Sequence, residues 1–363
     1  MRLKYEKPPL SYEQQADKLL SRGLIIGNKQ FVINALSSIN YYRLSAYFLP
    51  FQKDKENHIY YPGKKIEDII QLYQFDCEYR HLLFKIVESA EVLAKTRLTY
   101  HLVMKYNDPF CYLNKKLYSN RFLGGQIIVE DLVRQCRHFP DIDVKLIWKE
   151  LKNKSYISND GLVKVRFQSI DDFKLCDVRD EVKEAIFISF SISPFEEWLG
   201  KMRDSVLESK EEFIRHFRKK YTGSLDLPLW MVTETISFGQ LSKLYAGLNK
   251  EDRQRIAEIY GLTHRLLGQW LHSLVYLRNI CAHHARLWNR DIEIKPIKPK
   301  HLDDKNVWTN KVFSILLVLK RMVENTSEWE TFVEDLKALL ERNQFVNIRD
   351  MGFPADWERW LEK

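Results

Sequence analysis

The longest regular pattern in the chain is IEDIIQLYQFDCEYRHLLFKIVESAEVLAKTRLTYHLVMKY, residues 66–106. Its apolar residues recur at steps of three and four, the spacing that places side chains on one face of an α-helix. They are Ile66, Ile69, Ile70, Tyr73, Leu83, Ile86, Val87, Ala90, Leu93, Ala94, Leu98 and Leu102. The pattern stops at Asn107, Asp108 and Pro109, because proline has no amide proton with which to continue a helix. The sequence therefore predicts one long helix over 66–106.

Helical patterns continue on both sides of this segment. Ser11 and Gln14 have the spacing of a capping box, and Gly23 is a typical helix stop. Further helical segments are predicted at 29–37, 125–153, 184–222, 229–248, 262–288, 306–324 and 328–342. Residues 154–181 differ, because GLVKVRFQSI alternates between apolar and polar side chains. This alternation predicts a strand of a small β-hairpin.

Together these patterns predict a mainly α protein, a helical bundle with a small inserted β-hairpin. We expect five parts along the chain. They are an N-terminal helical segment packed on the bundle at 1–60, a first helical part of the core at 61–153, the inserted hairpin at 154–181, a second helical part at 182–345 and a C-terminal tail at 346–363.

The composition is typical of an intracellular protein that can bury a large core. Hydrophobic residues make up 45% of the 363 residues, and 57 Lys and Arg against 49 Asp and Glu give a net charge of +8. This modest excess is compatible with a polyanionic partner. The five cysteines are odd in number and none forms a CxxC pair, which argues against a disulfide framework or a cysteine zinc site. We see no secretory signal and no apolar run long enough for a membrane, so we expect a cytoplasmic protein without metal or cofactor.

The most distinctive polar residues lie in LRNICAHHARLWNR, residues 277–290. The apolar residues of this segment continue the stripe of the predicted 262–288 helix. Asn279 and His283 are four apart and would share a helix face. Arg278 and His283 are five apart, which is about 140° around an ideal helix. We therefore expect Arg278 and His283 either to flank a groove or to converge with a second copy across a dimer axis.

An arginine and a histidine together suit the cleavage of a phosphodiester bond. An imidazole takes or gives a proton near neutral pH. A guanidinium holds a phosphate with two hydrogen bonds and stabilises the charge that builds on its oxygens. RNA carries its own nucleophile, the 2′-hydroxyl group, so such a site requires neither a metal nor a nucleophilic side chain. The expected products carry a 2′,3′-cyclic phosphate and a 5′-hydroxyl group.

The longer context resembles a known family. The blocks INYYRLSAYFLPF (39–51), LPLWMVTETISFGQLSKLY (227–245) and RNICAHHARLWNR (278–290) are similar to the Abi (abortive infection) family of bacterial phage-defence proteins, in the AbiD/AbiF-like group. The similarity extends from about Lys7 to about Asn310, in several blocks in the same order. This extent makes it far more specific than the arginine and histidine spacing alone.

The resemblance implies the HEPN superfamily, whose members are helical bundles and in many cases metal-independent ribonucleases. Their signature, an Arg followed after four to six residues by His, falls on Arg278 and His283, and the polar residue after the Arg is Asn279. It implies that Arg278 binds the phosphate, that His283 transfers a proton and that Asn279 orients one of the two. It also implies a homodimer with a composite cleft, a likeness to the nuclease domains of type VI CRISPR effectors and, for some members, a small non-coding RNA partner.

Other residues are candidates for RNA contacts. His284, Arg286 and Arg290 lie beside the signature. Arg97 and His101 in TRLTYHL share a helix face but have only three residues between them, so they are interpreted as a surface pair or as an RNA contact.

The segment NYYRLSAYF places aromatic rings beside an arginine, a combination that stacks bases and holds phosphate in many RNA-binding proteins. We expect Tyr41 to contact RNA, and Tyr42 and Tyr47 to pack inside the protein. Arg43 is expected either to contact RNA or to pair with an acid.

Two other functions are compatible with the same sequence. The first is a non-catalytic RNA-binding scaffold in a toxin–antitoxin-like defence system, which would grip a structured RNA without cutting it. The second is a protein-binding toxin that ignores RNA.

Overall fold

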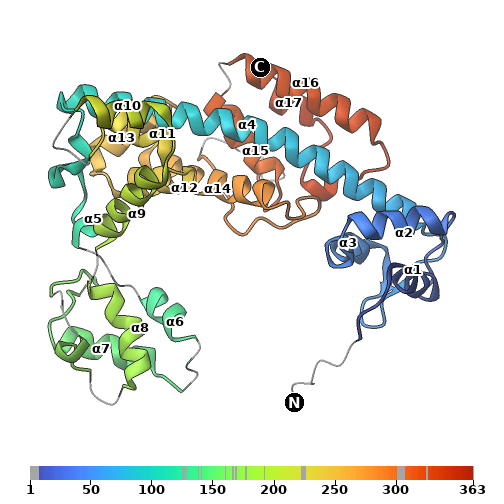
Figure 1. The fold of residues 1–363 in the computed structure, drawn as a ribbon, viewed down its shortest axis with the longest axis horizontal. Coiled ribbons are helices and arrows are strands. Elements are labelled where there is room, and N and C mark those ends of the chain that lie inside the picture. Colours follow the sequence, from blue (N-terminus) through green and yellow to red (C-terminus); the bar gives the residue numbers. More distant parts are fainter. Residues whose placement is uncertain are drawn as a thin grey trace. The chain divides into compact units, whose positions relative to one another are not determined.

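The computed structural model describes residues 8–362, except 125, 126, 128, 138, 140, 160, 166, 168, 169, 176, 177, 192, 222–225, 301–306, 324 and 325. The chain is mainly α-helical, as predicted, with a small β-hairpin (Figure 1). It divides into two compact units: residues up to 89 together with those from 276 onward, and residues 90–275. The division falls within two helices, α4 (Ile66–Tyr106) and α14 (His264–Ala282).

The predicted long helix is confirmed as α4, with the expected first and last residues. The predicted start of the chain's first helix is confirmed too. Ser11 and Gln14 form a capping box before α1 (Tyr12–Ser21), and Gly23 follows the helix end with a φ of +94°. A left-handed residue of this kind suits glycine, which has no Cβ to clash with the backbone.

The first unit continues from α1 through short elements before α4. These are α2 (Lys29–Ser38), α3 (Tyr41–Phe48), the 3₁₀ turn η1 (Leu49–Phe51), β1 (Gln52–Asp54) and β2 (Ile59–Tyr60). After α14 the unit adds α15 (Phe313–Val323), α16 (Ser327–Arg342), the 3₁₀ turn η5 (Ile348–Met351) and α17 (Trp357–Leu361).

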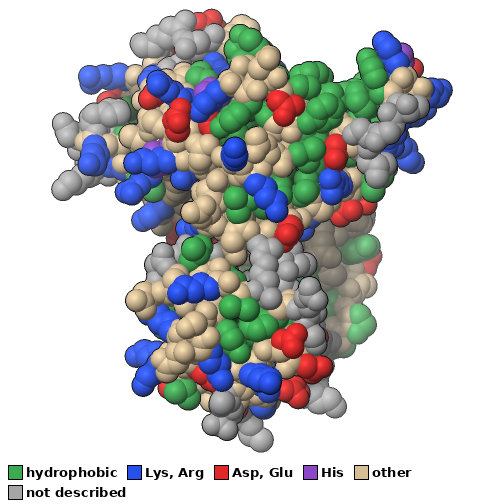
Figure 2. All heavy atoms as spheres, turned by 90° about the vertical axis from the view of Figure 1, so that its left-hand side faces the viewer, with side chains coloured by type: hydrophobic (Ala, Val, Ile, Leu, Met, Phe, Trp, Pro, Cys, Tyr) green, Lys and Arg blue, Asp and Glu red, His purple; other side chains and the backbone are tan. Residues whose placement is uncertain are grey.

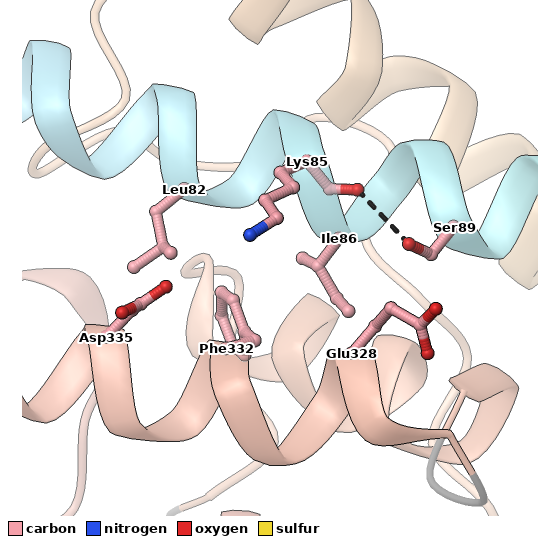
Figure 3. A pocket seen from close by; sticks show the side chains of 7 residues that line it. All are labelled: Leu82, Lys85, Ile86, Ser89, Glu328, Phe332 and Asp335. Carbon is pink, nitrogen blue, oxygen red and sulfur yellow. Dashed lines mark hydrogen bonds between the residues drawn. The ribbon is translucent and has the colours of Figure 1, made fainter.

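Helix α16 packs on the first half of α4. Leu82 and Ile86 from α4 face Phe332 from α16 across a small pocket (Figure 3). The C-terminal residues are anchored on the same helix, because the Trp329 indole nitrogen donates to the Leu361 carbonyl at 3.0 Å. The segment expected as a tail thus contains buried residues.

The second unit contains the rest of α4 and a set of shorter helices. They are η2 (Cys111–Leu113), η3 (Lys115–Leu117), α5 (Asn120–Gly124), α6 (Val129–Cys136), α7 (Val144–Asn153), η4 (Ile170–Asp172), α8 (Asp180–Ser191), α9 (Pro194–Glu208), α10 (Glu212–Lys220), α11 (Leu229–Thr235), α12 (Phe238–Gly247) and α13 (Lys250–Glu258). Lys and Arg side chains on the face shown in Figure 2 are interspersed with acidic and apolar ones.

The small β-hairpin lies at a different place from the one predicted. Strands β1 and β2 pair in antiparallel fashion, and the Asp54 carboxylate accepts hydrogen bonds from the turn between them. Where the structure describes residues 154–181, it shows an antiparallel bridge between Ile157 and Val163, with the Lys164 N–H donating to the Tyr156 carbonyl at 2.9 Å, and the turn η4. The described residues of 154–181 thus do not pair as two extended strands, and residues 166, 168, 169, 176 and 177 of the predicted strands lie outside the described part of the chain.

The apolar side chains of 154–181 pack against helices instead of against a second strand. Ile157, Val163, Phe173 and Leu175 join a local core with side chains from α6, α7 and α8. An alternating pattern shows only that one side of a segment is buried, and helices can cover that side as well as a strand can.

Candidate functional site

The helix that carries the signature ends earlier than predicted. We expected a helix over 262–288, but α14 ends at Ala282, and His283 and His284 lie in the following turn. The His284 N–H donates to the Cys281 carbonyl at 3.1 Å, and the Ala285 N–H donates to the Ile280 carbonyl at 3.0 Å. This is the pair of bonds of a Schellman helix end.

His284 occupies the left-handed position of this helix end, with a φ of +54°. Glycine is the usual residue there, although His tolerates a positive φ better than most side chains do. The turn thus holds an imidazole at a place where the backbone favours glycine. Such an outlier is a reason to suspect a function for the side chain.

An open groove of about 470 Å³ lies between this turn and α3. It is lined by Asn40, Tyr42, Arg43, Ala46, Tyr47, His283, His284, Ala285 and Arg286. Both histidines are exposed. The Arg43 guanidinium Nη1 donates to the His284 carbonyl at 2.6 Å, which ties α3 to the turn.

The lining of the groove is basic. It contains two arginines and two histidines, and this set of described residues includes no Asp or Glu. Positive charge in a concave surface favours an anionic ligand. The sequence-predicted residues that the structure brings together here are Arg43, His283, His284 and Arg286.

The tyrosines of α3 are arranged differently from the prediction. Tyr42, which we expected to pack inside, is 72% exposed and lines the groove. Tyr41, which we expected to contact RNA, is half-buried; its hydroxyl accepts a hydrogen bond from Arg22 at 3.1 Å, and burial raises its pKa. Helix α3 begins at Tyr41, and this phase turns Tyr42 outward. The prediction for Tyr47 is confirmed, since it is 1% exposed.

Arg278 does not line the groove. Its guanidinium carbon lies 5.8 Å from the centre of the Phe84 ring on α4, the geometry of a cation–π contact. Asn279 is exposed, and its carbonyl accepts the His283 N–H at 3.0 Å. Arg290 extends over Tyr276, with 6.0 Å from its guanidinium carbon to the ring centre, and one of its nitrogens donates to the Tyr276 hydroxyl at 3.4 Å.

Arg97 and His101 belong to the second unit and each has a protein partner. The Arg97 guanidinium carbon lies 4.6 Å from the centre of the Tyr260 ring. His101 Nε2 lies 3.3 Å from the carboxylate of Asp252, which is fully buried. These contacts place both side chains in the packing of α4 against α13 and against Tyr260, which follows it. That Arg97 and His101 contact RNA stays a prediction.

Asp76, a fully buried carboxylate on α4, is a residue of this region that sequence reasoning missed. It accepts hydrogen bonds from the backbone nitrogens of Leu287 and Trp288 and from the hydroxyl of Tyr47, which lines the groove. Burial raises the pKa of the Asp76 carboxyl, and the adjacent Arg80 opposes this shift. In the sequence, the sign of this role is an acid within an apolar stripe, Asp76, four residues before Arg80.

The helix end yields a prediction for stability. Replacing His284 by glycine removes the steric cost of the left-handed conformation but increases the entropy of the unfolded chain. We expect the free energy of unfolding to rise by about 0.5–1 kcal/mol, measured by urea denaturation. His283 does not have a positive φ, so His283→Gly serves as the control and is expected to lower the stability. A shift of both variants in the same direction would contradict the role of the backbone.

No helix in the described parts of the chain is both long enough and apolar enough to cross a membrane. Among the same residues, no three His, Cys, Asp or Glu side chains gather in a way that could hold a metal ion.

The fold and the groove define a helical protein with a basic, histidine-bearing surface at the end of one helix. Comparison with protein families gives a match to the Abi-like protein family over residues 34–138 and 150–289, more than half of the chain. The chain belongs to the Abi-like protein family. This membership supports a role in abortive infection, a form of defence against phage. No curated protein and no solved structure matches the chain.

Proposed function

We propose that this Abi-like protein is an endoribonuclease of the HEPN superfamily, in the AbiD/AbiF-like group, and that RNA binds in the groove between α3 and the turn after α14. The observation that carries the proposal is the exposed pair His283 and His284 in a groove lined by Arg43 and Arg286 and by no acid among its described residues. A groove of this charge suits a phosphate backbone. Tyr42 at its edge offers a ring for a base.

The proposed reaction uses the RNA's own hydroxyl group. The 2′-oxygen attacks the adjacent phosphorus and loses its proton, while the bond from phosphorus to the 5′-oxygen breaks and that oxygen gains a proton. His283 serves one of these two proton transfers. Guanidinium groups stabilise the negative charge on the phosphate oxygens. The products are a 2′,3′-cyclic phosphate and a 5′-hydroxyl group, and the chemistry draws on no group outside the protein and the RNA.

Arg278 has a different place in this proposal from the one expected for a single chain. It lies over Phe84, outside the set of residues that line the groove. Within one chain, Arg43 and Arg286 are therefore the nearest phosphate ligands for His283. We propose that a homodimer completes the catalytic site, with the Arg278 side chains acting across the interface.

The alternative is a non-catalytic protein that holds a small RNA in the same groove. The position of Arg278 over Phe84 favours this alternative, because a nuclease needs its phosphate ligand and its proton donor at one phosphate. The two functions share the RNA-binding groove and differ in whether the RNA is cut.

RNA binding by the groove is tested by removing its positive charge. The double variant Arg43→Ala and Arg286→Ala is expected to bind single-stranded RNA more weakly. The slope of log affinity against log salt should fall by about 0.7 for each phosphate that the protein no longer neutralises. Fluorescence polarisation across a salt series measures both quantities. Arg359, exposed on α17 and outside the groove lining, provides the control variant Arg359→Ala. Unchanged affinity and slope in the double variant would remove the groove as the RNA site.

Nuclease action is tested through the ends of the RNA that it leaves. RNA that co-purifies with the protein is sequenced after ligation that depends on a 2′,3′-cyclic phosphate. The nuclease proposal expects such ends in the wild type and their absence in the groove double variant. Intact RNA bound to the wild type, with no new ends under any condition of activation, would instead establish the scaffold function.

A further inference from the structure

Asp76 is the common acceptor of a buried hydrogen-bond network that includes Tyr47, a residue of the groove lining. Its Oδ1 accepts the Trp288 N–H at 2.7 Å, and its Oδ2 accepts the Leu287 N–H at 3.1 Å. The Oδ2 also accepts from the Tyr47 hydroxyl and from the Arg80 guanidinium. Asp76 is 0% exposed and Arg80 is 3% exposed. The carboxylate therefore joins α3, α4 and the turn after α14 at one point.

The turn needs such a support because its backbone leaves regular structure. His284 and Asn289 both have a positive φ, +54° and +50°. Between them the chain is not helical, so the N–H groups of Leu287 and Trp288 have no helical acceptor. Asp76 supplies an oxygen for each of them.

The turn is held at a second point, nearer the histidines. The Arg43 guanidinium donates to the His284 carbonyl at 2.6 Å. Arg43 and Tyr47 are one helical turn apart on α3, and Tyr47 contacts Asp76. The two anchors thus connect through α3, and both fix the segment that carries His283 and His284.

Arg80 fixes the position of the Asp76 carboxylate. It lies one turn after Asp76 on α4, so the ion pair forms within a single helix. One of its nitrogens also lies 3.2 Å from the Tyr47 hydroxyl, and the other lies 3.0 Å from the Cys77 sulfur. A buried carboxylate with all its partners in place has little freedom to move.

We propose that Asp76 is a positioning residue of the RNA-binding groove: it holds the 283–288 turn so that His283 and His284 face the same ligand as Arg43. Asp76 itself does not line the groove and acts through the turn. This inference rests on the proposed RNA-binding function and adds to it a residue that has no contact with RNA.

The experiment measures RNA affinity, with the fold of each variant checked by circular dichroism below its melting temperature. In Asp76→Asn an amide N–H₂ group replaces one carboxylate oxygen, so the N–H or O–H groups that donate to that oxygen lose their acceptor. We expect the affinity for a mixed-sequence single-stranded RNA to fall about tenfold, as for the loss of a charged hydrogen bond. Asp76→Glu keeps the charge beside Arg80 but displaces both oxygens by one methylene group, and it should weaken binding in the same sense.

A double-mutant cycle distinguishes positioning of the two histidines from a general effect of Asp76 on the fold. In a His283→Ala, His284→Ala background, Asp76→Asn should cause little additional loss of affinity, because the groups that it positions are already absent. Asp252→Asn also disrupts a buried carboxylate network, but Asp252 is not among the residues that line the groove. Folded Asp252→Asn protein should bind RNA as the wild type does.

The outcomes are distinguishable. Wild-type affinity in both Asp76 variants would overturn the positioning role and leave the groove proposal standing. A loss for Asp76→Asn that adds in full to the loss for the histidine variant would also overturn it, because Asp76 would then act independently of the histidines. Equal RNA binding by the wild type and by the histidine variant would also overturn the positioning role, because His283 and His284 would then add nothing to the affinity. Failure of the RNA-binding function itself would show in unchanged affinity of the Arg43→Ala, Arg286→Ala variant.

Discussion

Replacing His283 by alanine is expected to lower the rate of RNA cleavage by roughly 10²–10⁴-fold, the usual contribution of a general acid or base. The side chain is exposed in a basic groove, where it can reach a bound phosphate. RNA affinity should fall much less, because Arg43, Arg286 and Tyr42 remain in the groove. Single-turnover cleavage of a labelled RNA, with affinity measured in parallel, separates the two effects.

A matched control lies on the helix that precedes the turn. His272 is exposed on α14 but does not line the groove, so His272→Ala should cleave RNA at the wild-type rate. Full activity in folded His283→Ala protein would exclude the catalytic role of His283. An equal loss in both variants would indicate that the fold, and not the imidazole, is responsible.

Replacing Asp252 by asparagine is expected to destabilise the protein by about 3 kcal/mol, because it breaks a buried charge network. The Asp252 carboxylate is 0% exposed and accepts from the Lys105 amine at 2.8 Å, the Tyr106 hydroxyl at 2.7 Å and the Asn249 amide at 2.7 Å. An asparagine cannot offer an oxygen to all of them. Urea denaturation of both proteins at neutral pH measures the difference.

The same network predicts a dependence on pH. Burial opposes ionisation of Asp252, but hydrogen bonds from His101, Lys105, Tyr106 and Asn249 together lower its pKa below 3.8. A lowered folded-state pKa gives stability that is complete above the unfolded-state value and is lost as the pH falls toward the folded-state value. The stability difference between wild type and Asp252→Asn should therefore shrink below pH 3.8.

An exposed aspartate serves as the reference for this comparison. Asp180 pairs with Lys183 at 3.0 Å, but its side chain is 91% exposed. Asp180→Asn should change the stability by less than about 1 kcal/mol. A difference between wild type and Asp252→Asn that stays constant down to acid pH would contradict an ionised Asp252.

The sequence predicted most of what depends on local periodicity. The ends of α4 and the capping box at Ser11 are set by residues within one or two turns. The end of α14 was mispredicted because its left-handed position holds His284 where glycine would have marked the stop. The outward position of Tyr42 depends on the phase of an eight-residue helix, α3, which is too short for a periodic pattern to settle.

The candidate site was predictable only in part, for a related reason. His283, His284, Arg286 and Arg43 were identified from their chemistry, and the structure brings them into one groove. Arg278 lies outside that groove because α14 ends at Ala282. Arg278 is on the helix, whereas His283 is in the turn that follows it. Asp76 is 211 residues from Leu287 in sequence, and no local pattern connects two such distant positions.

The conformation of His284 has a consequence for attempts to engineer this protein. A selection for thermal resistance alone would favour glycine at position 284, because a residue without a Cβ adopts the positive φ there at a lower steric cost. If the imidazole contacts RNA as proposed, such a selection would accumulate well-folded but impaired proteins. A directed-evolution scheme for this protein therefore has to screen RNA binding and heat tolerance in the same round.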